Sequence, residues 1–204
     1  MRKYRWRFCP TVLLFLIWML FCDRSGIGVA TLLAAALHEC GHLAAAKWLR
    51  IPFRALRLTP LGARLETGTG VLSYGEEFLL AAAGPLTSLL ASLGAAMFWR
   101  AFGFFRLFSC ASLLLGVLNL LPIRSFDGGR MLESMLSQKA GVRVACRMMQ
   151  VLSFFFLLVL FSLAVYLLLR AGDGLSLLLF SVSLFFRFFD AMGGDPPCLP
   201  VIRK

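Results

Sequence analysis

The sequence predicts an all-α polytopic membrane protein with about six transmembrane helices and a small β-hairpin between the second and third. Hydrophobic residues make up 60% of the 204 residues, and the mean hydropathy is +0.84. Ordinary globular domains are only about 45–50% apolar. The apolar residues also gather in runs of about 20, which is the length of a helix that crosses a bilayer. The chain therefore carries more apolar surface than a soluble fold of this size buries.

Six apolar runs define the expected helices, at 8–22, 26–49, 78–99, 104–121, 148–169 and 174–189. A basic stretch precedes the first run, but no small-residue cleavage site follows it. We therefore expect a retained signal anchor rather than a cleaved signal peptide. We expect the whole chain, 1–204, to form one integral membrane domain.

The segment from Ile51 to Tyr74 differs from the apolar runs because it contains several prolines and glycines. Within it, Leu56-Arg57-Leu58 and Ala63-Arg64-Leu65 alternate between apolar and basic residues, as half-buried strands do. The alternation predicts a hairpin whose open edge could pair with an extended peptide. A plain basic loop, whose arginines only fix the topology, is the alternative.

The basic residues indicate the orientation of the chain. If the N-terminus is cytoplasmic, 17 of the 21 lysines and arginines fall in cytoplasmic segments, and only Arg24, Arg100, Arg106 and Arg170 lie outside. Short cytoplasmic segments of membrane proteins carry an excess of Lys and Arg. The sequence therefore predicts that both termini are cytoplasmic. The net charge of +11 needs no nucleic-acid partner, because no basic soluble domain is visible.

The two histidines of the chain, its only two, lie four residues apart in His38-Glu39-Cys40-Gly41-His42. Residues 31–37 and 43–46 on either side carry no charge, so a solvated helix face does not explain the pair. Ionisable residues inside an apolar helix indicate a functional site. The i, i+4 spacing places both imidazoles on one helix face, where they can bind one zinc ion while Glu39 serves as a base.

A catalytic zinc ion usually has three protein ligands and one open position for water. With no third histidine, the third ligand is expected to be a carboxylate. Asp127 is the best candidate, because it follows the fourth apolar run on the same membrane side as the histidines. Pro122 can end that helix, and Gly128 and Gly129 permit a tight turn. An ordinary exit turn is the other interpretation of this segment. Glu66, Glu76, Glu77 and Glu133 remain possible on that side, whereas Asp190 and Asp195 lie at or beyond the last expected helix.

Three motifs in this order resemble the site-2 protease family of intramembrane zinc metalloproteases. They are His38-Glu39-Cys40-Gly41-His42, then Ala83-Gly84-Pro85-Leu86, then Asn119-x-x-Pro122 with Asp127-Gly128-Gly129. Their spacing is most similar to a compact bacterial branch, which includes a sporulation factor that cleaves a membrane-tethered pro-sigma factor. The similarity covers about residues 26–133. It implies a core of the second to fourth helices, a membrane-associated sheet, and flanking helices at 8–22, 148–169 and 174–189.

The resemblance also implies roles for individual residues. The zinc ligands would be His38, His42 and Asp127, and the catalytic base would be Glu39. Candidate substrate-positioning residues are Asn119, Pro122, Gly84 and Pro85, although plain helix packing or a helix end explains them equally well. Relatives often carry Asn two residues after the Gly-Pro-Leu triplet, where this chain has Thr87 and Ser88. They also often read Pro-Leu-Asp-Gly-Gly, where this chain has Ser125 and Phe126 before Asp127. Both departures concern the positioning of substrate.

We therefore expect an intramembrane zinc metalloprotease in a bacterial cell or forespore membrane. Its substrate would be a membrane-tethered regulatory protein of the pro-sigma or anti-sigma type, and inhibitory or regulatory membrane proteins are further expected partners. Another kind of membrane zinc protease is one alternative, but such enzymes normally use Glu as the third ligand. A non-proteolytic zinc-binding scaffold or transporter is the other alternative, and it would have no need of Glu39.

Overall fold

The structure is a computed structural model that describes residues 5–8, 23, 25–51, 53–59, 62–67, 72–100, 102–171 and 175–193. Contacts divide the chain into two compact units. Unit 1 comprises Met1–Leu72 and Ala83–Val117, and unit 2 comprises Ser73–Ala82 and Leu118–Lys204. Of the expected helix 8–22, only Phe8 is described, at the end of strand β1 (Arg5–Phe8). The rest of that expected helix lies outside the described residues.

Unit 1 contains helix α2 (Ile27–Trp48), the larger part of α3 (Tyr74–Ala96) and most of α4 (Gly103–Asn119). These helices lie within a few residues of the expected runs at 26–49, 78–99 and 104–121. The start of α2 is fixed by Asp23, whose carboxylate accepts hydrogen bonds from the backbone N–H groups of Gly26 at 2.9 Å and Gly28 at 2.8 Å. A carboxylate in this place satisfies N–H groups that have no partner within the helix.

Small and polar residues join α3 to α4. The hydroxyl of Ser92 donates to the backbone carbonyl of Ser109, and the hydroxyl of Ser109 donates to that of Ser92, both at 2.9 Å. One turn earlier on α3, the side chain of Ser88 packs against Gly116, where an added Cβ would lie 3.2 Å from the Ser88 Cβ. Close packing of small residues and hydrogen bonds between helices are typical of helices within membranes.

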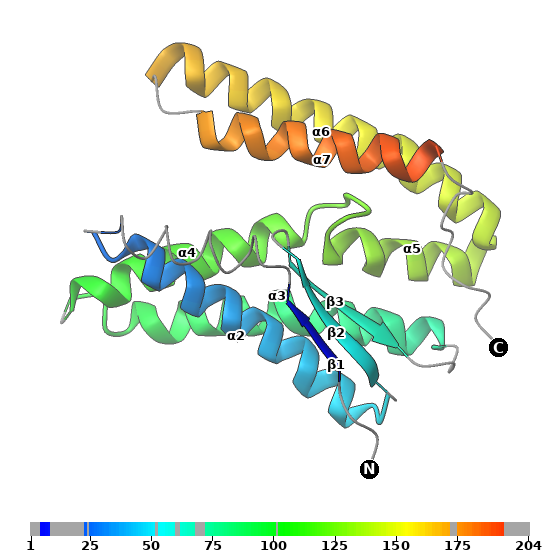
Figure 1. Ribbon diagram of the computed structural model, residues 1–204, viewed down its shortest axis with the longest axis horizontal. Helices are drawn as coiled ribbons and strands as arrows, with labels where there is room; N and C mark the ends of the chain where they lie inside the picture. The colour runs from blue at the N-terminus through cyan, green and yellow to red at the C-terminus, as the bar shows by residue number, and fades with distance from the viewer. Residues whose placement is uncertain are drawn as a thin grey trace. The chain divides into compact units, whose positions relative to one another are not determined.

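The sheet of unit 1 has the strand order β1-β2-β3 (Figure 1). Strands β2 (Phe53–Thr59) and β3 (Gly62–Thr67) pair antiparallel, with Leu56 opposite Leu65 and Leu58 opposite Ala63. Strand β1 pairs with β2 in parallel. The segment between α2 and α3 therefore contains two paired strands, and β3 is one of the two outer strands of the sheet.

Unit 2 contains the first turns of α3 and the helices α5 (Asp127–Ala140), α6 (Val142–Ala171) and α7 (Leu175–Gly193). The start of α3 has reciprocal caps: the Ser73 N–H donates to the Glu76 carboxylate at 2.8 Å, and the Glu76 N–H donates to the Ser73 hydroxyl at 3.2 Å. Helices α6 and α7 extend the expected runs 148–169 and 174–189. Helix α5 was not expected, because its sequence contains no long apolar run.

Helices α6 and α7 lie side by side (Figure 1), and their contact forms the core of unit 2. The buried residues of this core are Ile123, Leu157, Leu160 and Leu184. Phe126, which precedes α5, stacks on Phe180 of α7 with ring centroids 6.3 Å apart. The backbone N–H of Arg124 donates to the Ser153 hydroxyl of α6 at 2.9 Å. The loop between α4 and α5 is therefore attached to the α6–α7 pair on both sides of Ser125.

The helices bury small or polar side chains and expose large apolar ones. Trp48 and Leu93 are 74% and 68% exposed, whereas Ala34 and Ser92 are buried. This distribution is unfavourable in water and normal in lipid. Among the described residues, Ile27–Trp48, Tyr74–Ala96 and Val142–Arg170 are long and apolar enough to cross a membrane, and Gly103–Asn119 is a shorter apolar helix. These helices indicate an integral membrane protein, and the expectation of about six spans stays a prediction.

Candidate metal centre

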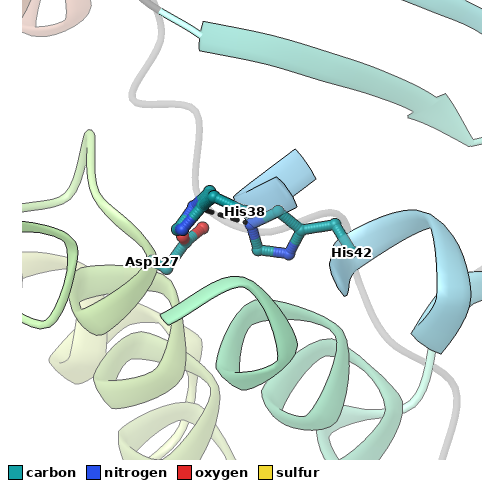
Figure 2. Close-up of side chains that lie close together, drawn as sticks. All are labelled: His38, His42 and Asp127. Carbon is teal, nitrogen blue, oxygen red and sulfur yellow. Dashed lines mark hydrogen bonds between the residues drawn. The ribbon is translucent and has the colours of Figure 1, made fainter. Parts of the chain in front are cut away.

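His38 and His42 form a buried pair on α2, with 5% and 7% of their surfaces exposed. Their rings meet edge to face at 81°, with centroids 4.9 Å apart. The Nε2 atoms of the two rings lie 3.2 Å apart, as the dashed line in Figure 2 marks. The spacing of one helical turn, which was predicted from the sequence, thus brings the Nε2 atoms of the two rings close together.

Gly84 of α3 makes room for that point. A Cβ added to Gly84 would overlap the Nε2 atom of His42 and lie 2.8 Å from the Nε2 atom of His38. Gly41 plays a similar part on α2, since a Cβ there would overlap the Thr87 hydroxyl and lie 2.7 Å from the Ala83 carbonyl oxygen. The two glycines therefore let the backbones of α2 and α3 approach each other beside the imidazoles.

Ser88, one turn after Gly84, contacts the far side of the first imidazole. Its hydroxyl oxygen lies 2.9 Å from Nδ1 of His38, and the residue is 1% exposed. The two ring nitrogens of His38 thus face different neighbours, with Nδ1 toward Ser88 and Nε2 toward His42.

Asp127 is the first residue of α5 and is 8% exposed. The next two positions must be glycine, because a Cβ on Gly128 would overlap the Leu120 carbonyl and a Cβ on Gly129 would overlap the Ile123 carbonyl. Backbone atoms cannot rotate away as a flexible side chain can. The two glycines therefore allow the first turn of α5 to pack directly against the loop that precedes it. This packing fixes the position of Asp127 at the start of the helix.

Arg130, one turn after Asp127, faces two carboxylates. Its guanidinium donates to Oε1 of Glu77 at 2.7 and 3.0 Å, and one of its nitrogens lies 3.7 Å from Oδ1 of Asp127. Glu77 is buried on the first turns of α3. Arg130 therefore places a positive charge within 4 Å of the Asp127 carboxylate while it binds Glu77.

Two ring nitrogens and a carboxylate oxygen are offered by His38, His42 and Asp127, the side chains drawn in Figure 2 and the only candidate metal-ligand group among the described residues. With Zn–N bonds of about 2.0–2.1 Å, two nitrogens on a tetrahedral zinc ion are about 3.3 Å apart. The Nε2 separation of 3.2 Å agrees with that value. Two imidazoles and one carboxylate are also a common donor set for catalytic zinc. The residues present therefore fit a zinc ion.

The other carboxylates considered from the sequence have different partners in the structure. Glu76 caps α3, and Glu77 binds Arg130. Glu133 accepts two hydrogen bonds from Arg124, at 2.8 and 3.2 Å. Burial by itself lowers the pKa of Arg124, but the charge of Glu133 and the hydrogen bonds to it outweigh this effect and raise the pKa. Glu66 lies on β3, and its side chain is outside the description.

The remaining candidate residues lie on α2, on α3, at the end of α4 and in the loop that follows it. Glu39 follows His38 on α2 and is half-buried, Pro85 is buried within α3, and Asn119 is the last residue of α4. Pro122 is half-buried in the loop before α5. Sequence reasoning did not assign a role to Ser88 or Arg130. The signal for Ser88 was its place one turn after Gly84, and the signal for Arg130 was its place one turn after Asp127.

We expect Gly84→Ala to weaken zinc binding while the helix still forms. The added methyl group would occupy the space in which the two Nε2 atoms meet, so one imidazole must rotate away. Gly94→Ala on the same helix is the matched control, because nothing lies within 4 Å of its added Cβ. Alanine at Gly94 should be neutral or stabilise the helix by about 0.5–1 kcal/mol. Zinc affinity of the purified proteins, measured against a chromophoric chelator, tests the difference. Equal affinities for the two variants would contradict it.

Comparison with known proteins points to one family. Residues 89–163 match the model of peptidase family M50, and this range includes Asn119, Pro122 and Asp127 but not the histidines. Stage IV sporulation protein FB of Bacillus subtilis (strain 168) is 31% identical over 122 residues. That alignment covers 57% of this chain and 42% of the relative, so the chain spans less than half of the relative's length.

A solved structure shows the fold. The site-2 protease from Methanocaldococcus jannaschii has a TM-score of 0.64 and 22% sequence identity to this chain, covering 100% of this chain and 98% of that one. At this identity the likeness establishes a shared fold, and activity has to be argued from the residues.

Proposed function

We propose that the chain belongs to the site-2 protease family and is a zinc metalloprotease that hydrolyses a peptide bond within or near the membrane segment of a membrane-tethered protein. The observation that carries the proposal is the convergence of two buried Nε2 atoms at 3.2 Å inside an apolar helix. Burying two imidazoles in lipid-facing helices is costly, and a metal site gives a reason for it.

Asp127 is the proposed third ligand. The histidines belong to unit 1 and Asp127 to unit 2, so this assignment is part of the proposal. It is supported by the donor atoms that the three residues offer, by the burial of the carboxylate and by the other partners found for Glu76, Glu77 and Glu133. It also distinguishes this chain from membrane zinc proteases that use Glu in that position.

Glu39 is the proposed general base. Zinc bound to the group would lower the pKa of a bound water toward about 7 and polarise the scissile carbonyl. The Glu39 carboxylate would accept the proton of the attacking water and deliver it to the leaving amine. His38 and His42 hold their Nε2 atoms in place for this chemistry, while Asn119 and Pro122 would orient the substrate at the end of α4.

Substrate class and orientation complete the proposal. The Bacillus subtilis relative is a stage IV sporulation protein, which supports a membrane-tethered regulatory protein of the pro-sigma or anti-sigma type as substrate. The distribution of basic residues supports cytoplasmic termini and a site that opens to the cytoplasm. Strand β3, an outer strand of the sheet, is the proposed edge on which an unwound substrate segment pairs.

Metal removal tests the proposal directly. Co-expression with candidate single-span regulatory proteins first identifies a substrate that is cleaved. We expect the purified chain in detergent to cleave a tagged form of that substrate. Treatment with a chelator should abolish cleavage, and added zinc should restore it, because the ligands bind a removable ion. Cleavage that continues without metal would contradict the proposal. Zinc binding without cleavage of any candidate would instead favour a zinc-binding scaffold or transporter.

A further inference from the structure

Ser88 is a buried polar residue that contacts a proposed metal ligand. Its hydroxyl oxygen is 2.9 Å from Nδ1 of His38, and only 1% of the residue is exposed. The two residues are on different helices, α3 and α2, and both belong to unit 1. The contact therefore depends on how these two helices pack.

We propose that Ser88 is a positioning residue of the metal centre, which orients His38 and fixes its tautomer. In this arrangement Nδ1–H of His38 donates to the Ser88 hydroxyl, and the lone pair of Nε2 remains available for the metal. The hydrogen bond made by one ring nitrogen of histidine decides which nitrogen binds a metal. The inference rests on the proposed function, since it concerns the same zinc site.

The position of Ser88 is itself held by packing. Gly84 and Ser88 are four residues apart on α3 and so lie on the same face of the helix. Gly84 leaves the space in which the Nε2 atoms of His38 and His42 meet, and Ser88 contacts Nδ1 of His38. On its other side, Ser88 packs against Gly116 of α4. One face of α3 thus lies beside both ring nitrogens of His38, and the contact between Ser88 and Gly116 packs that face against α4.

Removal of the hydroxyl should loosen this arrangement. Ser88→Ala takes away the acceptor at 2.9 Å and leaves space in which the His38 ring can rotate or adopt the other tautomer. Loss of such a partner typically lowers metal affinity by about 10–100-fold. We expect a reduction of that size in zinc affinity, with little change in the stability of the metal-free protein.

Three variants of the full chain test this. Ser88→Ala removes the hydroxyl, whereas Ser88→Thr keeps a hydroxyl at the same position. Ser112→Ala is the matched control, because Ser112 on α4 is fully buried and its hydroxyl has no hydrogen-bond partner among the described residues. Each protein is compared in the same detergent by zinc affinity against a chromophoric chelator, by the visible spectrum of bound Co²⁺, and by thermal unfolding without metal.

The expected result is a lower zinc affinity and an altered Co²⁺ spectrum for Ser88→Ala alone, because the spectrum reports ligand geometry and a merely structural loss would not change it. Recovery in Ser88→Thr would support the hydroxyl as the cause. Should Ser88→Thr misfold, the Co²⁺ spectrum of Ser88→Ala still decides the matter. The inference is overturned if Ser88→Ala matches Ser112→Ala in zinc affinity and spectrum while the parent protein binds zinc and cleaves substrate. A parent that binds zinc but cleaves nothing would overturn the proteolytic function and leave the role of Ser88 standing.

Discussion

Glu39→Gln should bind zinc as tightly as the parent protein and lose nearly all peptide hydrolysis. The substitution keeps the size of a half-buried side chain on α2 and removes only the carboxylate that we propose as the proton acceptor. General-base catalysis typically contributes about 10²–10⁴-fold to a rate, and we expect a loss in that range. His38 and His42 are unchanged, so the metal site should remain. Zinc content by elemental analysis and the rate of substrate cleavage are measured on the same preparation.

Cys40→Ser is the control for this experiment, because Cys40 is the next residue on the helix, is exposed and is a free thiol. It should retain both zinc and cleavage. A Glu39→Gln protein with a cleavage rate close to that of Cys40→Ser would refute the proposed role of Glu39. If Glu39→Gln lost its zinc as well, Glu39 would have to be treated as a ligand rather than as a base.

The histidine pair was predictable because its geometry is local. A spacing of four residues on a helix brings two side chains together whatever the rest of the chain does. The uncharged flanks of the two histidines predict the helix on which this spacing acts. The apolar runs were predictable for the same reason, since length and hydropathy alone define a lipid-crossing helix. Bounds of α2 to α4, α6 and α7 accordingly lie within a few residues of expectation, apart from the longer N-terminal end of α6.

Helix α5 could not be predicted in the same way. Asp127-Gly128-Gly129 has the composition of a turn, and glycine in a first helical turn is unfavourable by propensity. The structure has a helix there because Gly128 and Gly129 pack directly against the carbonyls of Leu120 and Ile123, which no other residue type permits. Tertiary contact therefore decides the local structure, and such contacts have no signature in a short sequence window.

The contact between Ser88 and His38 illustrates the same limit. The two residues are 50 positions apart, so only the packing of α2 on α3 brings them together. Gly84 was open to two interpretations, substrate positioning or helix packing. A Cβ added to Gly84 would meet both Nε2 atoms, which supports a role in close helix packing beside the two imidazoles, and a role in substrate positioning stays a prediction.

Asp127→Ala should remove both zinc and proteolysis, which is the largest effect we expect from any single substitution outside the histidines. Without the carboxylate, only two imidazoles of the proposed ligand set remain, and a zinc site built from two protein ligands binds weakly. At zinc concentrations about 100-fold above its dissociation constant, a bound ion stabilises the folded parent protein by about 2.7 kcal/mol. The variant should lose most of this zinc-dependent stabilisation, measured by thermal unfolding with and without a chelator.

Two further variants separate the ligand role of Asp127 from its place at the start of α5. A carboxylate in the first turn also stabilises a helix by about 0.3–1 kcal/mol, so Asp127→Ala should unfold somewhat more easily even without metal. Asp127→Asn keeps the size of the side chain and should show the same loss of zinc with less change in the metal-free protein. Glu76→Ala removes the capping carboxylate of α3 and should lower stability without lowering zinc content. If Asp127→Ala kept its zinc while Glu77→Ala or Glu133→Ala lost it, the third ligand would be one of those glutamates, and the assignment of Asp127 would be wrong.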